Sequence, residues 1–150
     1  MQISEFLRPE NVIVGLAGAN KRAVLEALCG RIAALSGGDA AVIFAALDNR
    51  EKLGSTGMGQ GIAIPHATVE GIGRPVGMLA RLNKPVEFDA IDEAPVDIVF
   101  VLLVPEHDRA AGLKLLSAAA RILRSDEVVA RMRAAGDAAA LYAAVATSDA

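Results

Sequence analysis

Val96-Asp-Ile-Val-Phe-Val-Leu-Leu-Val104 is an almost unbroken run of β-branched and aliphatic residues, and Pro105 follows it directly. A strand buried on one face alternates apolar and polar side chains, whereas a continuous apolar run is typical of a strand covered on both faces. We therefore predict a central, doubly buried strand over residues 96–104, ended by Pro105.

The segments on either side of this run predict both strands and helices. Short strands are expected at 12–14 and 74–82, the latter followed by a turn at 83–85. The first eight residues predict one helical turn that Pro9 ends. Helices are predicted at 21–35, from 40 onward, at 108–123, at 126–133 and at 138–146, with Asn20, Asp39, Ser125 and Asp137 at their N-termini. Strands mixed with helices in a chain of this length predict an α/β sandwich.

Three of these helices carry apolar residues at helical spacing, and we expect those residues to face the core. The predicted stripes are Val24, Leu25, Leu28, Ile32 and Leu35; Val42, Ile43, Leu47 and Leu53; and Leu113, Leu116, Ala120 and Leu123.

Composition limits the class of protein. The chain has 150 residues, is 53% hydrophobic and carries a net charge of −3, which predicts one domain over residues 1–150 with a core of its own. Without a basic patch or an aromatic platform, it is not expected to bind nucleic acid. The single cysteine, Cys29, excludes an internal disulfide and is expected to be a buried, inert thiol. No apolar run approaches the ~18 residues of a membrane span and no signal peptide is evident, so we expect a soluble, cytoplasmic protein.

The stretch with the most chemistry is Arg50-Glu-Lys-Leu-Gly-Ser-Thr-Gly-Met-Gly-Gln-Gly-Ile-Ala-Ile-Pro-His66. Its glycines at 54–61 allow tight turns and let backbone N–H groups approach an anion, although a mobile connector is the more common role of such a loop. The spacing matches neither a P-loop nor a dinucleotide-binding fingerprint. Arg50 and Lys52 near a helix C-terminus also have a simpler explanation, compensation of the helix dipole.

The histidine at the end of this stretch suggests a reaction. Ile62 and Ile64 alternate as in a short strand, and we expect Pro65 to end it and to leave His66 outside the pairing ladder. No Ser-His-Asp arrangement is visible, and one histidine cannot make a zinc site. One imidazole beside an anion-binding loop and an arginine favours phosphoryl transfer through a phosphohistidine.

The stretch 50–66 resembles the active-site signature of the enzyme IIA domains of the bacterial phosphotransferase system, fructose/mannitol type, and is most similar to the nitrogen-regulatory branch. The similarity continues through residues 88–105 and covers almost the whole chain. It implies a three-layer sandwich, with a small mixed β-sheet and helices on both faces. It also implies that no metal or organic cofactor is needed. His66 would accept a phosphoryl group on Nε2 from an HPr-like phosphocarrier, and Arg50 would be the active-site arginine. Positions around the phosphoryl site would be Ser55, Thr56, Gly57, Gly59 and Gly61.

One position departs from the family pattern. Gly112 stands where the family usually has a second histidine, which helps to position the phosphorylated one. Arg109, three residues earlier and on the same helical face, is our candidate for an auxiliary role. His107, at the start of that helix, is a weaker candidate, because an exposed loop histidine is the simpler interpretation. The prediction is that Arg109, or nothing, replaces the missing imidazole.

Three functional classes follow from this reading. The first is a nitrogen-regulatory IIA protein that binds different targets in its two phosphorylation states. The second is a sugar-specific IIA component that passes phosphate to a IIB domain. The third is a binding module whose phosphotransfer is impaired by Gly112. The sequence contains no IIB or membrane segment, which favours the first class, and the intact 50–66 signature argues against the third.

Overall fold

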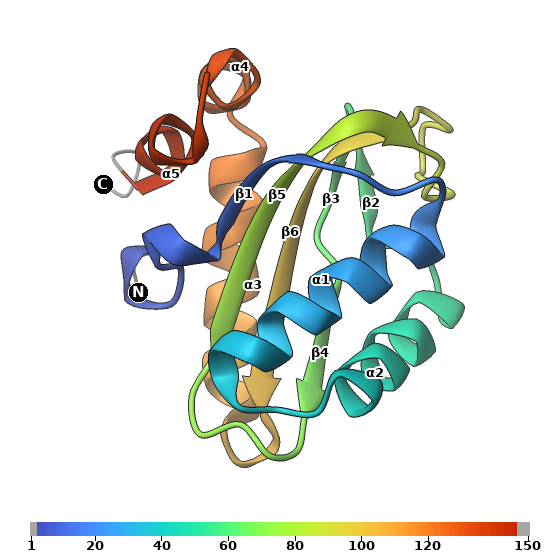
Figure 1. The fold of residues 1–150 in the computed structure, drawn as a ribbon, viewed down its shortest axis with the longest axis vertical. Coiled ribbons are helices and arrows are strands. Elements are labelled where there is room, and N and C mark those ends of the chain that lie inside the picture. Colours follow the sequence, from blue (N-terminus) through green and yellow to red (C-terminus); the bar gives the residue numbers. More distant parts are fainter. Residues whose placement is uncertain (1–2, 147–150) are drawn as a thin grey trace.

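A computed structural model describes residues 3–146 and contains a mixed six-stranded sheet (Figure 1). The strand order is β1-β5-β6-β3-β2, and β4 pairs with β6 beyond the end of β3. The strands are β1 (Val12–Leu16), β2 (Gly57–Gly59), β3 (Ile62–Ala63), β4 (His66–Val69), β5 (Val76–Val86) and β6 (Val96–Pro105).

The central strand is β6, as the sequence predicts. It pairs antiparallel with β5 on one side and parallel with β3 and β4 on the other. Every residue of β6 except Asp97 is buried, and the strand ends at Pro105. A strand with neighbours on both sides and cores on both faces has no room for polar side chains, which explains its unbroken apolar sequence.

Helices cover both faces of the sheet and make two separate apolar cores (Figure 1). On one face lie α1 (Lys21–Ser36) and α2 (Ala40–Lys52); on the other lie α3 (Arg109–Leu123), α4 (Asp126–Ala134) and α5 (Ala138–Ala146). Short 3-10 turns are η1 (Ile3–Glu5), η2 (Pro9–Asn11) and η3 (Glu106–Asp108). The predicted three-layer α/β sandwich is therefore confirmed.

The predicted N-terminal caps of the helices are present. The side chains of Asn20, Asp39 and Ser125 accept backbone N–H bonds at the starts of α1, α2 and α4. Asp137 accepts from Ala140 N at 2.8 Å at the start of α5. Each cap satisfies backbone donors that the first helical turn leaves free, and so fixes where the helix begins.

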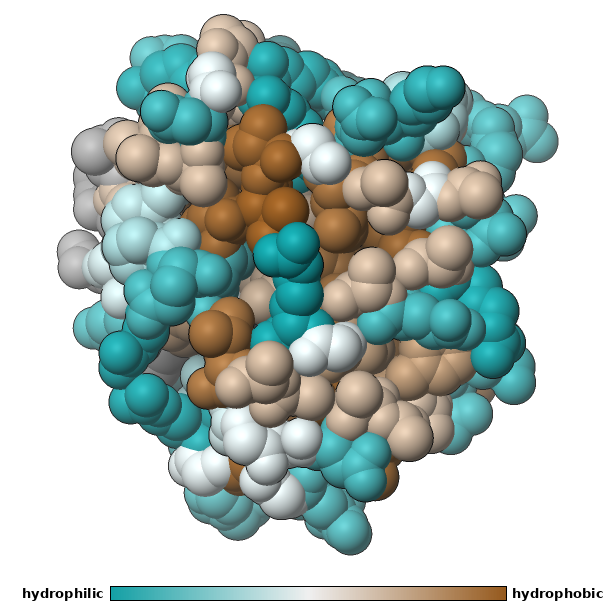
Figure 2. Space-filling model, viewed as in Figure 1, coloured by the Kyte–Doolittle hydropathy of each residue, from teal (hydrophilic) through white to brown (hydrophobic). Residues whose placement is uncertain are grey.

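The surface seen in the view of Figure 1 has apolar side chains between the C-terminal helices and α1, where the edge strand β1 crosses (Figure 2). Ile13 and Val14 of β1 are only half-buried.

No helix within residues 3–146 is long and apolar enough to cross a membrane. Cys29 is buried as predicted, and burial, together with the nearby charge of Glu26, raises the pKa of its thiol to about 12.

The predicted apolar stripes are wrong at several positions. Leu35, Leu53 and Leu113 are 51%, 86% and 72% exposed, and Val42 is also exposed. In α3 the buried residues are Leu115, Ala118, Ala119, Ile122 and Leu123. Leucines and alanines lie on more than one face of this helix, so periodicity alone does not decide which face meets the sheet.

The predicted turn at 83–85 is also wrong. β5 continues through these residues to Val86, and its pairing with β6 shifts register between Arg81 and Val86. A proline at an irregularity of the ladder removes no regular hydrogen bond, so Pro85 is compatible with a strand here. At the N-terminus, residues 3–5 form the predicted single turn, but Pro9 begins a second short turn.

Candidate functional site

His66 is the first residue of β4 and pairs with Leu102 of β6. The expectation that Pro65 leaves His66 outside the ladder is therefore wrong. Proline lacks an N–H donor, but its carbonyl still accepts: Leu102 N donates to Pro65 O at 2.9 Å. Pairing with β6 thus resumes at once, and the regular sheet fixes the backbone of His66.

The hydrogen bond of the imidazole determines its tautomer. Nδ1 of His66 lies 2.8 Å from the carbonyl oxygen of Ile64. A carbonyl oxygen only accepts, so Nδ1 must carry the proton in this contact. In the neutral ring the lone pair is then on Nε2, the nitrogen that the family resemblance implies. The half-buried side chain leaves part of the ring open to solvent.

The sheet also decides which face His66 occupies. Directly paired residues on neighbouring strands project to the same face. Leu102, the partner of His66, and Val104 belong to the core that also contains Leu115 of α3. His66 is therefore on the α3 side of the sheet.

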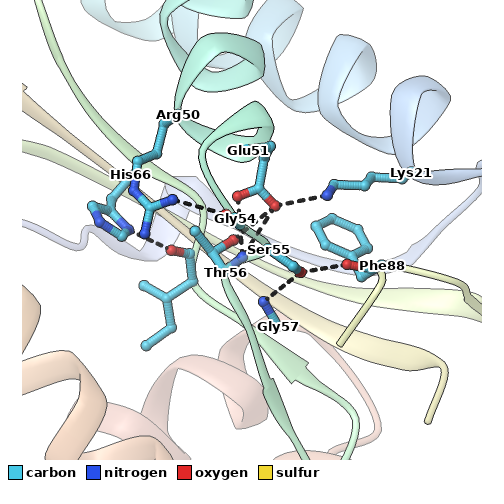
Figure 3. A network of polar contacts seen from close by, with 10 residues as sticks. Lys21, Arg50, Glu51, Gly54, Ser55, Thr56, Gly57, His66 and Phe88 are labelled. Carbon is cyan, nitrogen blue, oxygen red and sulfur yellow. Dashed lines mark hydrogen bonds and ion pairs between the residues drawn. The ribbon is translucent and has the colours of Figure 1, made fainter. Parts of the chain in front are cut away.

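Arg50 lies in the last turn of α2, and its Nη1 donates to the carbonyl oxygen of Gly54 at 2.8 Å. Gly54 has a φ of 150°, which favours glycine at the point where the chain leaves the helix. Figure 3 shows Arg50 and His66 at one end of a polar network, with Lys21 and Phe88 at the other end. The structure thus brings the predicted arginine and histidine into one region.

Both loop hydroxyls already donate their protons inside the protein. Ser55 Oγ donates to Phe88 O and accepts from Gly57 N. Thr56 Oγ1 donates to Glu51 Oε1 at 3.0 Å, and Thr56 N donates to the same carboxylate. These bonds hold the loop in place. Direct contact of either hydroxyl with a phosphoryl group stays a prediction, and it requires the hydroxyl to leave its present partner.

Two residues of this network were missed by the sequence reasoning. Glu51 has a side chain only 4% exposed, and Lys21 Nζ lies 2.9 Å from its Oε1. The same ammonium lies 5.0 Å from the centre of the Phe88 ring. Glu51 stands between Arg50 and Lys52 in the sequence, a charged run that is typical of a solvent-exposed helix end. Lys21 is thirty residues away in sequence, so only the packing of α1 on α2 brings the pair together.

The three predicted glycines serve the β2–β3 hairpin instead of surrounding His66. A Cβ at Gly57 would lie 2.8 Å from Cβ of Ala90, so the backbones approach closely there. Gly61 follows Gln60 in a tight turn, and both have positive φ angles. A Cβ at Gly61 would lie 2.5 Å from Nη2 of Arg133.

The hairpin tip lies away from the imidazole along the sheet. Ile62 pairs with Ile98, whereas His66 pairs with Leu102. At about 3.3 Å per residue this separates the two positions by ~13 Å. The structure therefore does not bring Gly59 and Gly61 to His66, and of the predicted loop positions Ser55, Thr56 and Gly57 are the ones in its network.

The opposing wall at Gly112 is closed to a side chain. A Cβ at this position would lie 2.9 Å from Cγ2 of Val104, which pairs with Thr68 two residues after His66. Arg109 and His107 are exposed, and within residues 3–146 neither side chain makes a hydrogen bond or an ion pair. The structure thus shows no polar contact from either residue to His66. Nor does this part of the chain bring three His, Cys, Asp or Glu side chains together as metal ligands would be.

Comparison with known proteins agrees with this architecture. The family model described as "Phosphoenolpyruvate-dependent sugar phosphotransferase system, EIIA 2" matches residues 5–148. The nitrogen regulatory protein of Pseudomonas aeruginosa is 44% identical over 143 residues, covering 95% of this chain and 93% of that protein. That of Bradyrhizobium diazoefficiens is 38% identical over 146 residues, covering 97% and 95%. The crystal structure of nitrogen regulatory protein IIA-Ntr from Neisseria meningitidis is similar with a TM-score of 0.90 at 33% identity, covering 95% and 98%.

Proposed function

Because this chain belongs to the family of phosphoenolpyruvate-dependent sugar phosphotransferase system EIIA 2 domains, we propose that it is a nitrogen-regulatory IIA protein phosphorylated on His66. The donor is an HPr-like phosphocarrier, the exchange takes place in the cytoplasm, and residues 1–150 act as one IIA domain. The observation that carries the proposal is the bond from Nδ1–H of His66 to Ile64 O, which leaves Nε2 as the nucleophile.

The transfer exchanges one N–P bond for another. The lone pair on Nε2 of His66 attacks the phosphorus of the donor phosphohistidine, and the electron pair of the donor N–P bond stays on the donor nitrogen. A donor ring protonated on its other nitrogen leaves as neutral imidazole, and the positive charge passes to the His66 ring. Nδ1 keeps its proton, and Ile64 O stabilises the developing positive charge by accepting the hydrogen bond from Nδ1–H.

Arg50 is the cation proposed for the phosphoryl oxygens. Its guanidinium is half-buried and uses one nitrogen, Nη1, to hold Gly54 O. Its remaining donors make no hydrogen bond within residues 3–146, and their planar fork matches the geometry of a phosphoryl group. The hydrogen bond to Gly54 O keeps the guanidinium near the hydrogen-bond network of His66, so α2 does not need to move for Arg50 to act.

Regulation follows from charge. A phosphoryl group on nitrogen adds roughly two negative charges at one half-buried position, as phosphorylation does on oxygen. A surface that carries this charge repels acidic partners and attracts basic ones, so the two forms are expected to bind different targets.

The proposal is tested with phosphoenolpyruvate, enzyme I and a phosphocarrier of the nitrogen branch. Wild-type protein is expected to gain the mass of one acid-labile phosphoryl group, and His66→Ala to gain none. His107→Ala is the matched control, because it removes the other histidine of the chain, which is exposed and makes no polar contact within the described residues. A wild-type chain without the mass gain would support the binding-module interpretation. Onward transfer of the phosphoryl group to a IIB domain would support a sugar-specific component.

A further inference from the structure

We propose that Glu51 is a positioning residue for His66: its buried carboxylate fixes the Thr56 backbone, which through Ile64 sets the tautomer and orientation of the imidazole. The proposal rests on phosphorylation of His66 as proposed above for its effect on transfer. It assigns to Glu51 a role that its place among exposed charges in the sequence does not suggest.

The carboxylate is the centre of the network in Figure 3. It accepts from Thr56 N at 3.2 Å, from Thr56 Oγ1 at 3.0 Å and from Lys21 Nζ at 2.9 Å. Its side chain is 4% exposed, so water does not replace a lost partner freely. A nearly buried carboxylate with three donors is a rigid anchor, because Thr56 constrains it from the loop with two donors and Lys21 constrains it from α1 with the third.

The anchor is connected to the imidazole through one backbone–backbone hydrogen bond and one side chain–backbone hydrogen bond. Thr56 O accepts from Ile64 N at 3.1 Å, and Ile64 O accepts from Nδ1 of His66 at 2.8 Å. The N–H and C=O of Ile64 belong to consecutive peptide units, so a fixed N–H restricts where the carbonyl can point. That carbonyl in turn holds the proton on Nδ1 and the lone pair on Nε2.

Two adjacent residues at the end of α2 hold the loop at 54–56, one as a donor and the other as an acceptor. Arg50 donates to Gly54 O, and Glu51 accepts from Thr56 N. The loop therefore accepts a hydrogen bond from Arg50 and donates hydrogen bonds to Glu51, both at the end of α2. Lys21, whose ammonium also lies over Phe88, brings the first turn of α1 to the same carboxylate. The position of the Ile64 carbonyl thus depends on where two helices meet.

Glu51→Gln is the decisive variant, because it keeps the size of the side chain and removes its charge. The amide offers one acceptor oxygen and turns a donor nitrogen toward a site that holds three donors, so Thr56 or Lys21 loses its partner. We expect the Nε2–H tautomer of His66 to gain population in the unphosphorylated protein, measured from the imidazole nitrogen shifts by NMR. Displacements of about 1 Å at a reacting group cost up to roughly a hundredfold in rate, so we expect transfer to slow tenfold or more, with KM for the carrier changed much less.

Three further variants make the test specific. Asp48→Asn is the matched control. Asp48 lies on the same helix, and its carboxylate pairs with Lys52 Nζ at a distance of 3.1 Å, outside the network of Glu51. Thr56→Val removes the hydroxyl contact and is expected to move the tautomer in the same direction, whereas Thr56→Ser, which keeps the hydroxyl, should restore it. This pair decides the question if Glu51→Gln fails to fold.

The proposal is overturned if Glu51→Gln, or Thr56→Val in its place, leaves the His66 tautomer and the transfer rate equal to those of Asp48→Asn. The NMR measurement needs no phosphoryl donor. A wild-type chain that takes up no phosphoryl group would therefore refute the proposed function, while the tautomer of the variants would still decide the role of Glu51.

Discussion

At the residue scale, Gly112 shows how one small residue fits its neighbour. Val104 belongs to the central strand and is buried, and its two methyl groups would lie 2.9 Å and 3.1 Å from a Cβ at position 112. The position is therefore glycine for a steric reason that can be stated without reference to catalysis. An imidazole at this position would require Val104 or the start of α3 to shift.

Gly112→Ala should destabilise the protein relative to Gly30→Ala. Both glycines are inside helices, where alanine is favoured by about 1 kcal/mol, but a Cβ at Gly30 meets nothing within 4 Å. Overpacking at Gly112 is expected to cost about 1–3 kcal/mol beyond that gain. Urea unfolding of the two variants measures the difference. The same difference measured in a Val104→Ala background should shrink; if it is unchanged, contact with Val104 is not the cause.

At the element scale, the β2–β3 hairpin is tied to the loop before β6. Asp92 accepts from Gln60 N at 2.9 Å and from Ala94 N at 3.1 Å. These N–H donors, Gln60 first, lower the pKa of the Asp92 carboxyl. Arg133 adds a second tie, from Nη2 to Gln60 O at 2.6 Å and to Asp97 Oδ1 at 2.9 Å. The glycines of the hairpin are thus required by its close contacts.

The lowered pKa of Asp92 predicts how the hairpin responds to acid. A group whose pKa is lower in the folded than in the unfolded protein stabilises the fold above its unfolded pKa, about 3.9. That contribution is lost as the pH falls through the folded pKa. Wild type should therefore be more stable than Asp92→Asn at neutral pH, and the two should converge once the pH falls below the folded pKa of Asp92, measured by thermal unfolding.

Asp89→Asn is the control for this experiment. Asp89 is in the same loop and has a φ of 53°, which asparagine also adopts readily, but its carboxylate makes no hydrogen bond among the described residues. Its stability difference from wild type should be small at both pH values. A difference for Asp92→Asn that does not depend on pH would contradict the assignment.

At the scale of the whole molecule, one arginine of the sheet holds the end of α4. Nη1 of Arg81, in β5, lies 2.9 Å from Met132 O, 3.3 Å from Arg133 O and 2.6 Å from Ala135 O. These carbonyls lie at and just after the C-terminal end of α4, where the last carbonyls of a helix lack regular helical partners; Met132 O also accepts from Ala135 N at 3.4 Å. The sheet therefore caps a helix that lies about fifty residues further along the chain.

Arg81→Met should loosen α4 and α5 more than it affects the rest of the molecule. Hydrogen bonds from a charged donor contribute about 1.5–3 kcal/mol, and methionine keeps most of the side-chain volume. Hydrogen exchange of the α4 amides should accelerate, while that of the β6 amides should follow only the change in global stability. Arg121→Met, on the exposed side of α3, is the control. Equal exchange in the two variants would show that the carbonyl contacts of Arg81 do not hold α4.

The elements and the site were predictable to different degrees. The central strand was evident because eight of the nine residues from Val96 to Val104 are apolar, as a strand covered on both faces requires. The caps of α1, α2 and α4 were evident because each is a polar side chain directly before an apolar helical segment. The buried side of α3 was not, because Leu113 and Leu115 are both apolar and only contact with β6 chooses between them. The histidine and arginine were found from their types and spacing, whereas Lys21 and Glu51 meet only when α1 packs on α2.

The sequence by itself determined the family and the layered α/β fold, and it singled out the histidine that we propose to react, because these depend on local periodicity and on a contiguous motif. Tertiary structure decided which imidazole nitrogen is free, because the Ile64 carbonyl that holds Nδ1–H is itself placed by the pairing of Ile64 with Thr56. It also decided that Gly112 admits no side chain and that Glu51 is an anchor instead of a surface charge. Such contacts join segments that are distant along the chain, and the local pattern of the sequence does not show which distant residues come into contact.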